Sequence, residues 1–210
     1  MTSVLNTVED AIEDIKNGKV VIVVDDEDRE NEGDMICASE LMTPEIVNFM
    51  VTEARGLLCV ALTKERCDEL NLSLMVKNNT AVHQTAFTVS TDLLGYGCTT
   101  GVSASDRSQT IKALTDKKME AKDFATPGHI FPLIANPNGL LARPGHTEAA
   151  VELAVLAGLK PSGVLIEVLN DDGTMSRLPD LLIIAERFNL KIVSIKAIIE
   201  YLQASGKKLA

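Results

Sequence analysis

The sequence contains no tryptophan, and aromatic residues make up only 3% of its 210 positions. Proteins that bind single-stranded nucleic acids stack the bases on aromatic side chains, so this kind of site is not expected. Basic residues are also scarce, 20 against 30 acidic ones, which gives a formal net charge of -10. Because such a surface repels polyanions, we expect no nucleic-acid partner. An anionic small molecule can bind only where the site supplies local positive charge.

Long hydrophobic runs are absent from the sequence as well. No stretch approaches the roughly 20 apolar residues that a transmembrane helix needs, and the N-terminal residues have neither the basic segment nor the apolar core of a signal peptide. The four cysteines lack the C-x-x-C spacing of zinc fingers and thioredoxin-like sites. We therefore expect no membrane partner, a cytoplasmic location and free thiols.

Hydrophobic residues, at 46%, suffice for a sizeable core, and the length suits one large domain over residues 1–210. Short β-branched apolar runs, typical of buried strands, alternate with capped amphipathic segments, typical of helices. Strands are expected at 19–24, 57–62, 86–90, 130–135, 163–169 and 191–195. Helices are expected at 8–17, 44–55, 105–114, 147–157, 179–188 and 196–204. This alternation predicts a single-domain, three-layer α/β/α fold.

The most unusual segment is residues 25–34, DDEDRENEGD, which carries seven carboxylates. A charge run of this kind is most often a solvated loop. Here it directly follows a predicted buried strand, the usual place for sites in α/β proteins. Glu30, Glu32 and Asp34 alternate, so in an extended chain they point the same way and attract a hard divalent cation. An EF-hand is excluded because its closing position would be Ser39.

Residues 143–148, RPGHTE, stand at a predicted helix start, where free backbone N–H groups bind anions. Arg143 and the Thr147 hydroxyl would add to this site and supply the positive charge that a phosphate needs. His146 is a candidate metal ligand, because an imidazole, a carboxylate and open water positions form a common catalytic arrangement. A helix start with an exposed histidine explains these residues equally well.

Two further ionisable residues are candidates for acid–base catalysis. His129 follows Pro127 and Gly128, and this placement on a tight turn before a strand suits a general acid or base. Glu167 lies within the apolar run GVLIEVL, where burial would raise the pKa of its carboxyl group. A turn histidine bonded to backbone and a water-facing edge strand are the alternative interpretations.

Two weaker signals involve a glycine-rich segment and a cysteine. Residues 95–101 are rich in glycine but lack the spacing of a dinucleotide loop. Thr99 and Thr100 could still line a phosphate pocket. Cys59 falls in a predicted buried strand, which favours a packed core thiol over a reactive one.

Taken together, five stretches resemble the 3,4-dihydroxy-2-butanone 4-phosphate synthase family. They occur in one order over nearly the whole chain, and the set is highly specific although no single motif is decisive. They are DDEDRENEGD (25–34), GCTTGVSASDR (97–107), KDFATPGHIFPL (122–133), RPGHTEAAVELAVLAGLKPSGVLIE (143–167) and KIVSI (191–195). The resemblance is to the stand-alone form rather than to fusions with a GTP cyclohydrolase II domain.

The resemblance implies a lyase of riboflavin biosynthesis that converts D-ribulose 5-phosphate to L-3,4-dihydroxy-2-butanone 4-phosphate and formate. It implies a twisted mixed β-sheet and a homodimer with active sites at the interface. It also implies Mg²⁺, with Mn²⁺ as an alternative, held by Glu30 and His146, and His129 and Glu167 as the essential acid–base pair. The implied contacts to the phosphosugar are Arg29, Glu30, Asp34, Thr100, Arg143, Pro144, Gly145, His146, Thr147 and Glu167.

Other functions remain open on the residues alone. A pentose-phosphate isomerase or aldolase would use the same enediolate chemistry, but it would release no formate. A non-catalytic nucleotide- or RNA-associated module is opposed by the negative charge and the few aromatics. A purely structural cation-binding protein would use the acidic segment but would leave residues 143–147 unexplained.

Overall fold

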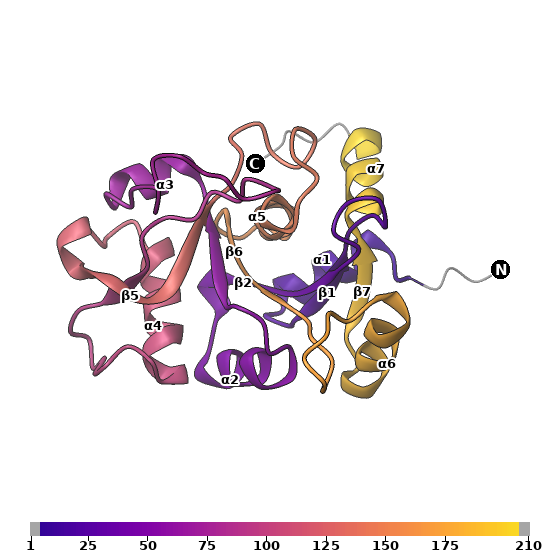
Figure 1. Cartoon of the computed structure of the whole chain (residues 1–210), viewed down its shortest axis with the longest axis horizontal. Helices are drawn as coiled ribbons and strands as arrows, with labels where there is room; N and C mark the ends of the chain where they lie inside the picture. Colours follow the sequence, from indigo (N-terminus) through magenta and orange to yellow (C-terminus); the bar gives the residue numbers. More distant parts are fainter. Residues whose placement is uncertain (1–4, 206–210) are drawn as a thin grey trace.

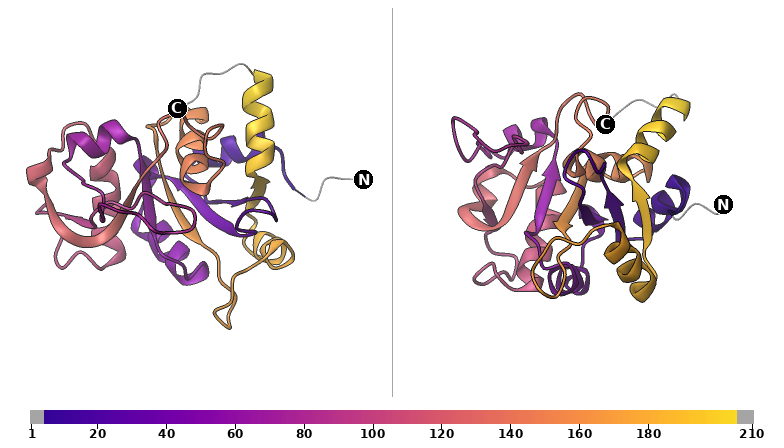
Figure 2. Two further views of the ribbon diagram at one scale, coloured as in Figure 1. Left: turned by 45° about the horizontal axis from the view of Figure 1, so that its top comes forward. Right: turned by 45° about the vertical axis from the view of Figure 1, so that its right-hand side comes forward.

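A computed structural model describes residues 5–205, which form a seven-stranded mixed β-sheet between two layers of helices (Figures 1 and 2). The strands are β1 (Val21–Val24), β2 (Gly33–Ala38), β3 (Cys59–Leu62), β4 (Thr91–Leu93), β5 (Phe124–Ile134), β6 (Ser162–Glu167) and β7 (Lys191–Ser194). Their order in the sheet is β4-β5-β3-β6-β2-β1-β7. The pairs β1–β7 and β3–β5 are parallel, and the remaining neighbours are antiparallel.

The α-helices are α1 (Val8–Lys16), α2 (Pro44–Glu53), α3 (Lys64–Glu69), α4 (Ala104–Thr115), α5 (His146–Leu156), α6 (Leu178–Phe188) and α7 (Ile195–Ser205). In Figure 1, α2 and α6 lie below the strands, and α5 and α7 lie above them. Side chains that alternate along each strand feed two separate cores. Ile22, Met35 and Val60 pack in the core with α2, α4 and α6, whereas Val21 and Ile36 pack in the core with α1, α5 and α7. The predicted three-layer α/β/α fold with a mixed sheet is confirmed.

The helix starts follow the capping residues closely. The hydroxyls of Thr7, Thr43 and Thr63 accept hydrogen bonds from backbone N–H groups three residues ahead, at α1, α2 and α3. At α4 the capping residue is Ser103, not Ser105, because the Ser103 hydroxyl accepts the N–H of Asp106. Such a capping residue is visible in the sequence, whereas a strand end has no comparable signal, so helix starts are easier to predict than strand ends.

Strand β2 was missed in the sequence, and the extended arrangement predicted for residues 30–34 is wrong. Residues 27–30 form a turn, and Asn31 has a left-handed φ of 54°. The strand then begins at Gly33, so Asp34 belongs to the sheet rather than to a loop. Glycine and aspartate are rare in strands, which hid the start of β2.

Two more segments differ from the predictions. In residues 86–90 only Phe87 and Thr88 make isolated bridges, and the edge strand β4 starts at Thr91. Strand β5 begins at Phe124, so His129 lies inside this strand and not on a tight turn before it. Thr91 pairs with Ile130 while Asp92 pairs with Ala125, so the residues between Ala125 and Ile130 bulge out of the ladder. Proline is rare inside a strand but is tolerated at a bulge. Pro127 and Gly128 therefore led to the prediction of a turn, although they lie within β5.

Two further findings concern the length of the helices and the state of the cysteines. No helix within residues 5–205 is both long and apolar enough to cross a membrane. The four cysteines are free thiols, as predicted. Cys59 is buried in β3, and burial raises the pKa of its thiol further than its neighbours Glu167 and Asp34 do.

Candidate active site

A cavity of about 110 Å³ opens between the residues after β1, the ends of β2 and β6, and the start of α5. Charged side chains dominate its lining, and Leu57, Cys59, Phe87, Leu133 and Leu165 supply apolar walls. The charged lining residues are Arg29, Glu30, Glu32, Asp34, Arg143, His146 and Glu167. Most of the site residues expected from the sequence therefore meet in one place, although they come from three separate segments.

The sheet register brings two carboxylates together. Asp34 on β2 is the direct antiparallel partner of Glu167 on β6, and directly opposite side chains lie on the same face. Period-two alternation puts Ile36 and Leu165 on this face too, in the core beneath α5. The Glu167 carboxylate is fixed because its Oε2 accepts the N–H of Leu57 at 2.9 Å. A buried carboxyl group, that of Asp34, and a half-buried one, that of Glu167, thus lie side by side near the start of α5.

The turn that carries Glu30 is organised by Asp25. The Asp25 carboxylate accepts hydrogen bonds from the N–H of Glu30 at 3.0 Å, the N–H of Glu32 at 2.9 Å and the Arg29 guanidinium at 2.9 Å. Its side chain is 1% exposed. Asp25 was part of the acidic run but was not singled out in the sequence. Its oxygens satisfy the backbone of the turn, and this aims Glu30 at the cavity.

Arg177, at the start of α6, holds the same turn from the other side. Its Nη1 donates to the carbonyl oxygen of Glu30 at 2.9 Å and also to that of Asn31. No sequence signal pointed to this contact, because its partners are more than 140 positions away along the chain. Arg177 ties the carboxylate-bearing turn to the helical layer.

If Glu30 binds Mg²⁺, as the family resemblance implies, Arg177→Ala should weaken that binding by roughly 10- to 100-fold, because groups that orient a metal ligand typically contribute this much. Isothermal titration with Mg²⁺ measures the change. The matched control is Arg187→Ala on the same helix, where the guanidinium stacks 4.7 Å from the Phe188 ring centroid. Equal affinities in the two variants would mean that Arg177 does not position Glu30.

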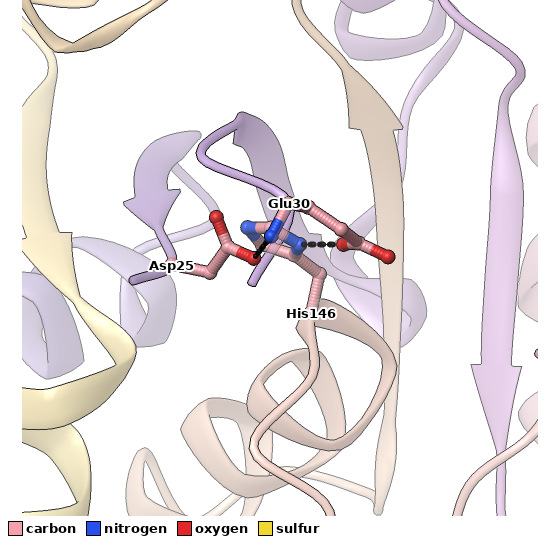
Figure 3. Close-up of side chains that lie close together, drawn as sticks. All are labelled: Asp25, Glu30 and His146. Atoms are coloured by element: carbon pink, nitrogen blue, oxygen red, sulfur yellow. Dashed lines mark hydrogen bonds and ion pairs between the residues drawn. The ribbon is translucent and has the colours of Figure 1, made fainter. Parts of the chain in front are cut away.

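His146, the first residue of α5, lies among these carboxylates (Figure 3). Its Nδ1 is 3.6 Å from Glu30 Oε2 and 3.9 Å from Asp34 Oδ1. The ring is buried, and its Nε2 has no hydrogen-bond partner among residues 5–205. Burial alone would lower the pKa of His146, but the charges of Asp34, Glu30 and Asp25 raise it to about 9. The site therefore stabilises a positive charge at the imidazole.

The two acids beside His146 respond in opposite ways. Interaction with His146, and next with Arg29, lowers the pKa of Glu30 to about 2. Burial raises the pKa of Asp34 to about 7, and the negative charges of Glu167 and Glu30 add to the rise against the opposing charge of His146. Glu30 is therefore a permanent anion, while Asp34 can gain or lose a proton near neutral pH.

The donor atoms fit a divalent cation. One ligand atom each from Asp25, Glu30 and His146 lie within 4.8 Å of one another. The Asp25 oxygens already accept three hydrogen bonds, whereas the Glu30 carboxylate accepts one, from Arg29 Nη1 to Oε2 at 2.6 Å, so Glu30 and His146 are the better candidates for ligands. Since Mg²⁺ binds its ligands at about 2.0–2.1 Å, one ion can bridge two atoms up to roughly 4 Å apart. The 3.6 Å between Nδ1 and Oε2 lies within that span.

The predicted phosphate end of the cavity lies at the start of α5, where Thr147 lines the wall. Arg143 does not offer a free charge there. Its Nη1 is 2.6 Å from the buried carboxylate of Glu148, and its Nη2 donates to the Thr85 hydroxyl at 3.3 Å. A Cβ on Gly145 would be 2.4 Å from Arg143 Nη1, so glycine makes room for this pair. The backbone N–H groups of α5 and the Thr147 hydroxyl are left as donors.

His129 and Thr100 lie apart from this cavity. His129 sits in the β5 bulge, four residues before Leu133, which lines the cavity. Thr100 belongs to a loop held by Asp106, whose carboxylate accepts the N–H groups of Thr99 and Gly101. Within one chain, the expected site residues thus form two groups: one lines the cavity, and the other, His129 and Thr100, lies outside it.

Pro144 stands at the border between the cavity and a second depression. It lines a groove with Arg29, Ile195 and Ile199, next to α7. The expected contact between Pro144 and substrate is therefore not part of the charged cavity, although its neighbour Gly145 packs against Arg143 and Glu148 there.

Comparison with known proteins gives one consistent result. Residues 9–201 match the family model described as 3,4-dihydroxy-2-butanone 4-phosphate synthase. The chain is 63% identical to the riboflavin biosynthesis protein RibBA of Cytophaga hutchinsonii over 94% of its own length, but it spans only 49% of that protein. It is 58% identical to the 3,4-dihydroxy-2-butanone 4-phosphate synthase of Agrobacterium fabrum, with 93% of this chain and 92% of that protein covered.

Solved structures agree with the sequence matches. A 3,4-dihydroxy-2-butanone 4-phosphate synthase in complex with two magnesium ions superposes with a TM-score of 0.93 at 39% identity, and the match covers 98% of this chain and 100% of that one. The two-domain synthase RibBX of A. baumannii superposes with a TM-score of 0.89 at 48% identity over 94% of this chain and 58% of its own. The chain therefore spans about half the length of the RibBA relative and 58% of RibBX.

Proposed function

The chain belongs to the 3,4-dihydroxy-2-butanone 4-phosphate synthase family of enzymes, and on that premise we propose that it converts D-ribulose 5-phosphate to L-3,4-dihydroxy-2-butanone 4-phosphate and formate. The proposal includes a role in riboflavin biosynthesis, in the cytoplasm. The observation that carries it is the meeting of Glu30, Asp34, His146 and Glu167 in one cavity. In this set Glu30 and His146 are candidate ligands for a cation, and the pKa values of the two acids Glu30 and Asp34 differ, at about 2 and about 7.

In this proposal Glu30 and His146 hold Mg²⁺, with Mn²⁺ as an alternative. A bound divalent cation acts as a Lewis acid toward neighbouring sugar oxygens and stabilises negative charge that develops on them. Support comes from the 3.6 Å between His146 Nδ1 and Glu30 Oε2, the two atoms that would bind the ion. The related structure with two magnesium ions is consistent with a cation in this fold.

The reaction begins by removal of a proton from the carbon beside the ketone, and it later expels water and formate. Asp34 and Glu167 exchange protons with the substrate in this proposal. Asp34 has a pKa near 7, so it can both accept and return a proton at neutral pH. Glu167 uses Oε2 to accept the Leu57 N–H, and this bond leaves Oε1 to face the substrate. Cys59, whose thiol stays protonated, and Leu165 shield the pair from water.

The phosphate group binds at the other end of the cavity, at the start of α5. The N-terminal N–H groups of the helix and the Thr147 hydroxyl donate to its oxygens. Arg143 orients this end through Glu148 and Thr85, and it contributes charge if the phosphate displaces Glu148. Anchoring the phosphate converts binding energy into orientation of the reacting carbons.

A homodimer with shared active sites completes the proposal. His129 and Thr100 lie outside the cavity of their own chain, so a second copy would have to bring them to it. Exposed apolar side chains next to the cavity support such a contact. Leu57 is 43% exposed, and Val82, which borders an adjoining depression with Arg143, is 91% exposed. Burying these groups against another chain is favourable.

Incubation with ribulose 5-phosphate and Mg²⁺ tests the function directly. We expect stoichiometric release of formate, and we expect a chelator to abolish it and added Mg²⁺ to restore it. Formate is measured with a coupled dehydrogenase, and the four-carbon phosphate by mass spectrometry. Conversion to an isomeric pentose phosphate or to aldol fragments, without formate, would instead assign an isomerase or an aldolase.

A further inference from the structure

His129 forms a close pair with Asp92 of the edge strand β4. The His129 Nδ1 lies 2.6 Å from Asp92 Oδ2, and the backbone N–H of His129 donates to Asp92 Oδ1 at 2.8 Å. The two oxygens of the Asp92 carboxylate thus contact two different groups of His129, the ring nitrogen Nδ1 and the backbone N–H. The Asp92 side chain is 15% exposed, whereas that of His129 is 48% exposed. One edge of the imidazole is anchored and the other edge faces outward.

The backbone around this pair is shaped to fit it. The register shift between Thr91 and Asp92 turns the Asp92 carboxylate toward the β5 bulge. A Cβ on Gly128 would lie 2.1 Å from the Thr91 carbonyl carbon and 2.4 Å from the Asp92 nitrogen. A Cβ on Gly101 would lie 2.1 Å from Asp92 Oδ2 and 2.8 Å from His129 Nδ1. Two chain segments therefore approach Asp92 and His129 as closely as only glycine allows.

We propose that Asp92 is the positioning residue of His129: it holds the imidazole in the tautomer with the proton on Nδ1 and presents Nε2 to the substrate. The inference rests on the proposed function, in which a second copy brings His129 to the cavity, and on the acid–base role that the family resemblance implies for this residue. Asp92 itself does not touch the substrate. It acts through the orientation and protonation pattern of the imidazole.

The chemistry of the two partners dictates this assignment. An ionised carboxylate only accepts hydrogen bonds, so the nitrogen facing Oδ2 must carry a proton. Nε2 is then the atom that takes up and returns a proton. A half-exposed imidazole without an anchor would rotate and populate both tautomers. The second bond, from the backbone N–H of His129 to Oδ1, keeps the carboxylate in the plane where it meets Nδ1.

The tautomer can be read without measuring activity. The chain has three histidines, and ¹⁵N-histidine labelling with the His129→Gln variant assigns the His129 signals by difference. We expect Nδ1 of the native protein to show a protonated shift and Nε2 an unprotonated one at high pH. In Asp92→Asn the amide NH₂ can donate to Nδ1, so the two shifts should exchange. Asp92→Glu should restore the native pattern. Unchanged shifts in Asp92→Asn would overturn the proposal.

Kinetics separate a positioning role from a general structural one. Asp92→Asn should lower kcat for formate release by up to roughly 10⁴-fold, the loss expected when a general base is held in the wrong tautomer. KM for ribulose 5-phosphate should stay within about threefold, since no substrate contact is removed. Asp92→Glu should recover most of the lost kcat. The matched control is Asp116→Asn, whose carboxylate also accepts a backbone N–H, that of Lys118, in a turn at the end of α4.

Two results distinguish failure of this inference from failure of the proposed function. If His129→Gln is inactive while Asp92→Asn keeps kcat within about threefold of the native value, the positioning role is wrong and the role of His129 stands. If His129→Gln is fully active, the role of His129 is wrong and the positioning proposal falls with it.

Discussion

Glu167→Gln is expected to lower kcat for formate release by roughly two to four orders of magnitude, the range for loss of a positioned acid or base. Glutamine has the same shape, and its carbonyl oxygen can still accept the N–H of Leu57. The close approach of Gly56, where a Cβ would lie 2.7 Å from Glu167 Oε2, leaves no room for a larger side chain but accommodates this one. The variant therefore removes the ionisable group and keeps the packing.

The measurement pairs formate release under saturating substrate with thermal unfolding followed by circular dichroism. The melting temperature should change little, because no buried hydrogen bond is lost. Glu186→Gln, an exposed carboxylate on α6, serves as the control for the loss of one negative charge. Native-like kcat in Glu167→Gln would remove this residue from the acid–base machinery and leave Asp34 as the candidate in the cavity.

The sequence predicted the layers of the fold well because burial patterns are local. Apolar runs such as residues 19–24 and 191–195 became adjacent parallel strands, and threonine caps marked three helix starts. Strand β2 escaped because it opens with Gly33 and Asp34, residues typical of turns. What decided its conformation was pairing with β1 and β6 on both sides, which is a long-range property.

The composition of the cavity was also largely predictable, but its geometry was not. Glu30 and His146 were expected to share a cation, and the structure brings them together. The direct pairing of Asp34 with Glu167, 133 positions apart, depends on the register between two strands, which no local pattern encodes. Arg177 and Asp92 act through contacts with distant segments for the same reason. Arg143 was expected to be a free charge, and its pairing with Glu148 became visible only in the fold.

The proposal that Glu30 and His146 share one cation leads to a second prediction with a large effect. Glu30→Gln and His146→Gln should each weaken Mg²⁺ binding by at least roughly a hundredfold, or about 2.7 kcal/mol. The reason is that each removes one of two protein ligands, and an Mg²⁺ ion with waters elsewhere in its shell depends heavily on both. Isothermal titration with Mg²⁺ alone gives the affinities, and the exposed Glu45→Gln is the control.

The double variant decides whether one ion is shared. If both side chains bind the same ion, losing the second ligand costs less once the first is gone, so the two losses should not add. Independent sites would give additive losses, and that result would contradict the shared site.

Without metal, His146→Gln should also destabilise the fold, because the imidazolium balances the buried Asp34 and the anionic Glu30. Glu30→Gln should destabilise it less, since Asp34 still faces the imidazolium. That ordering follows from the burial of Asp34 rather than from metal binding, so it tests the electrostatics of the site independently.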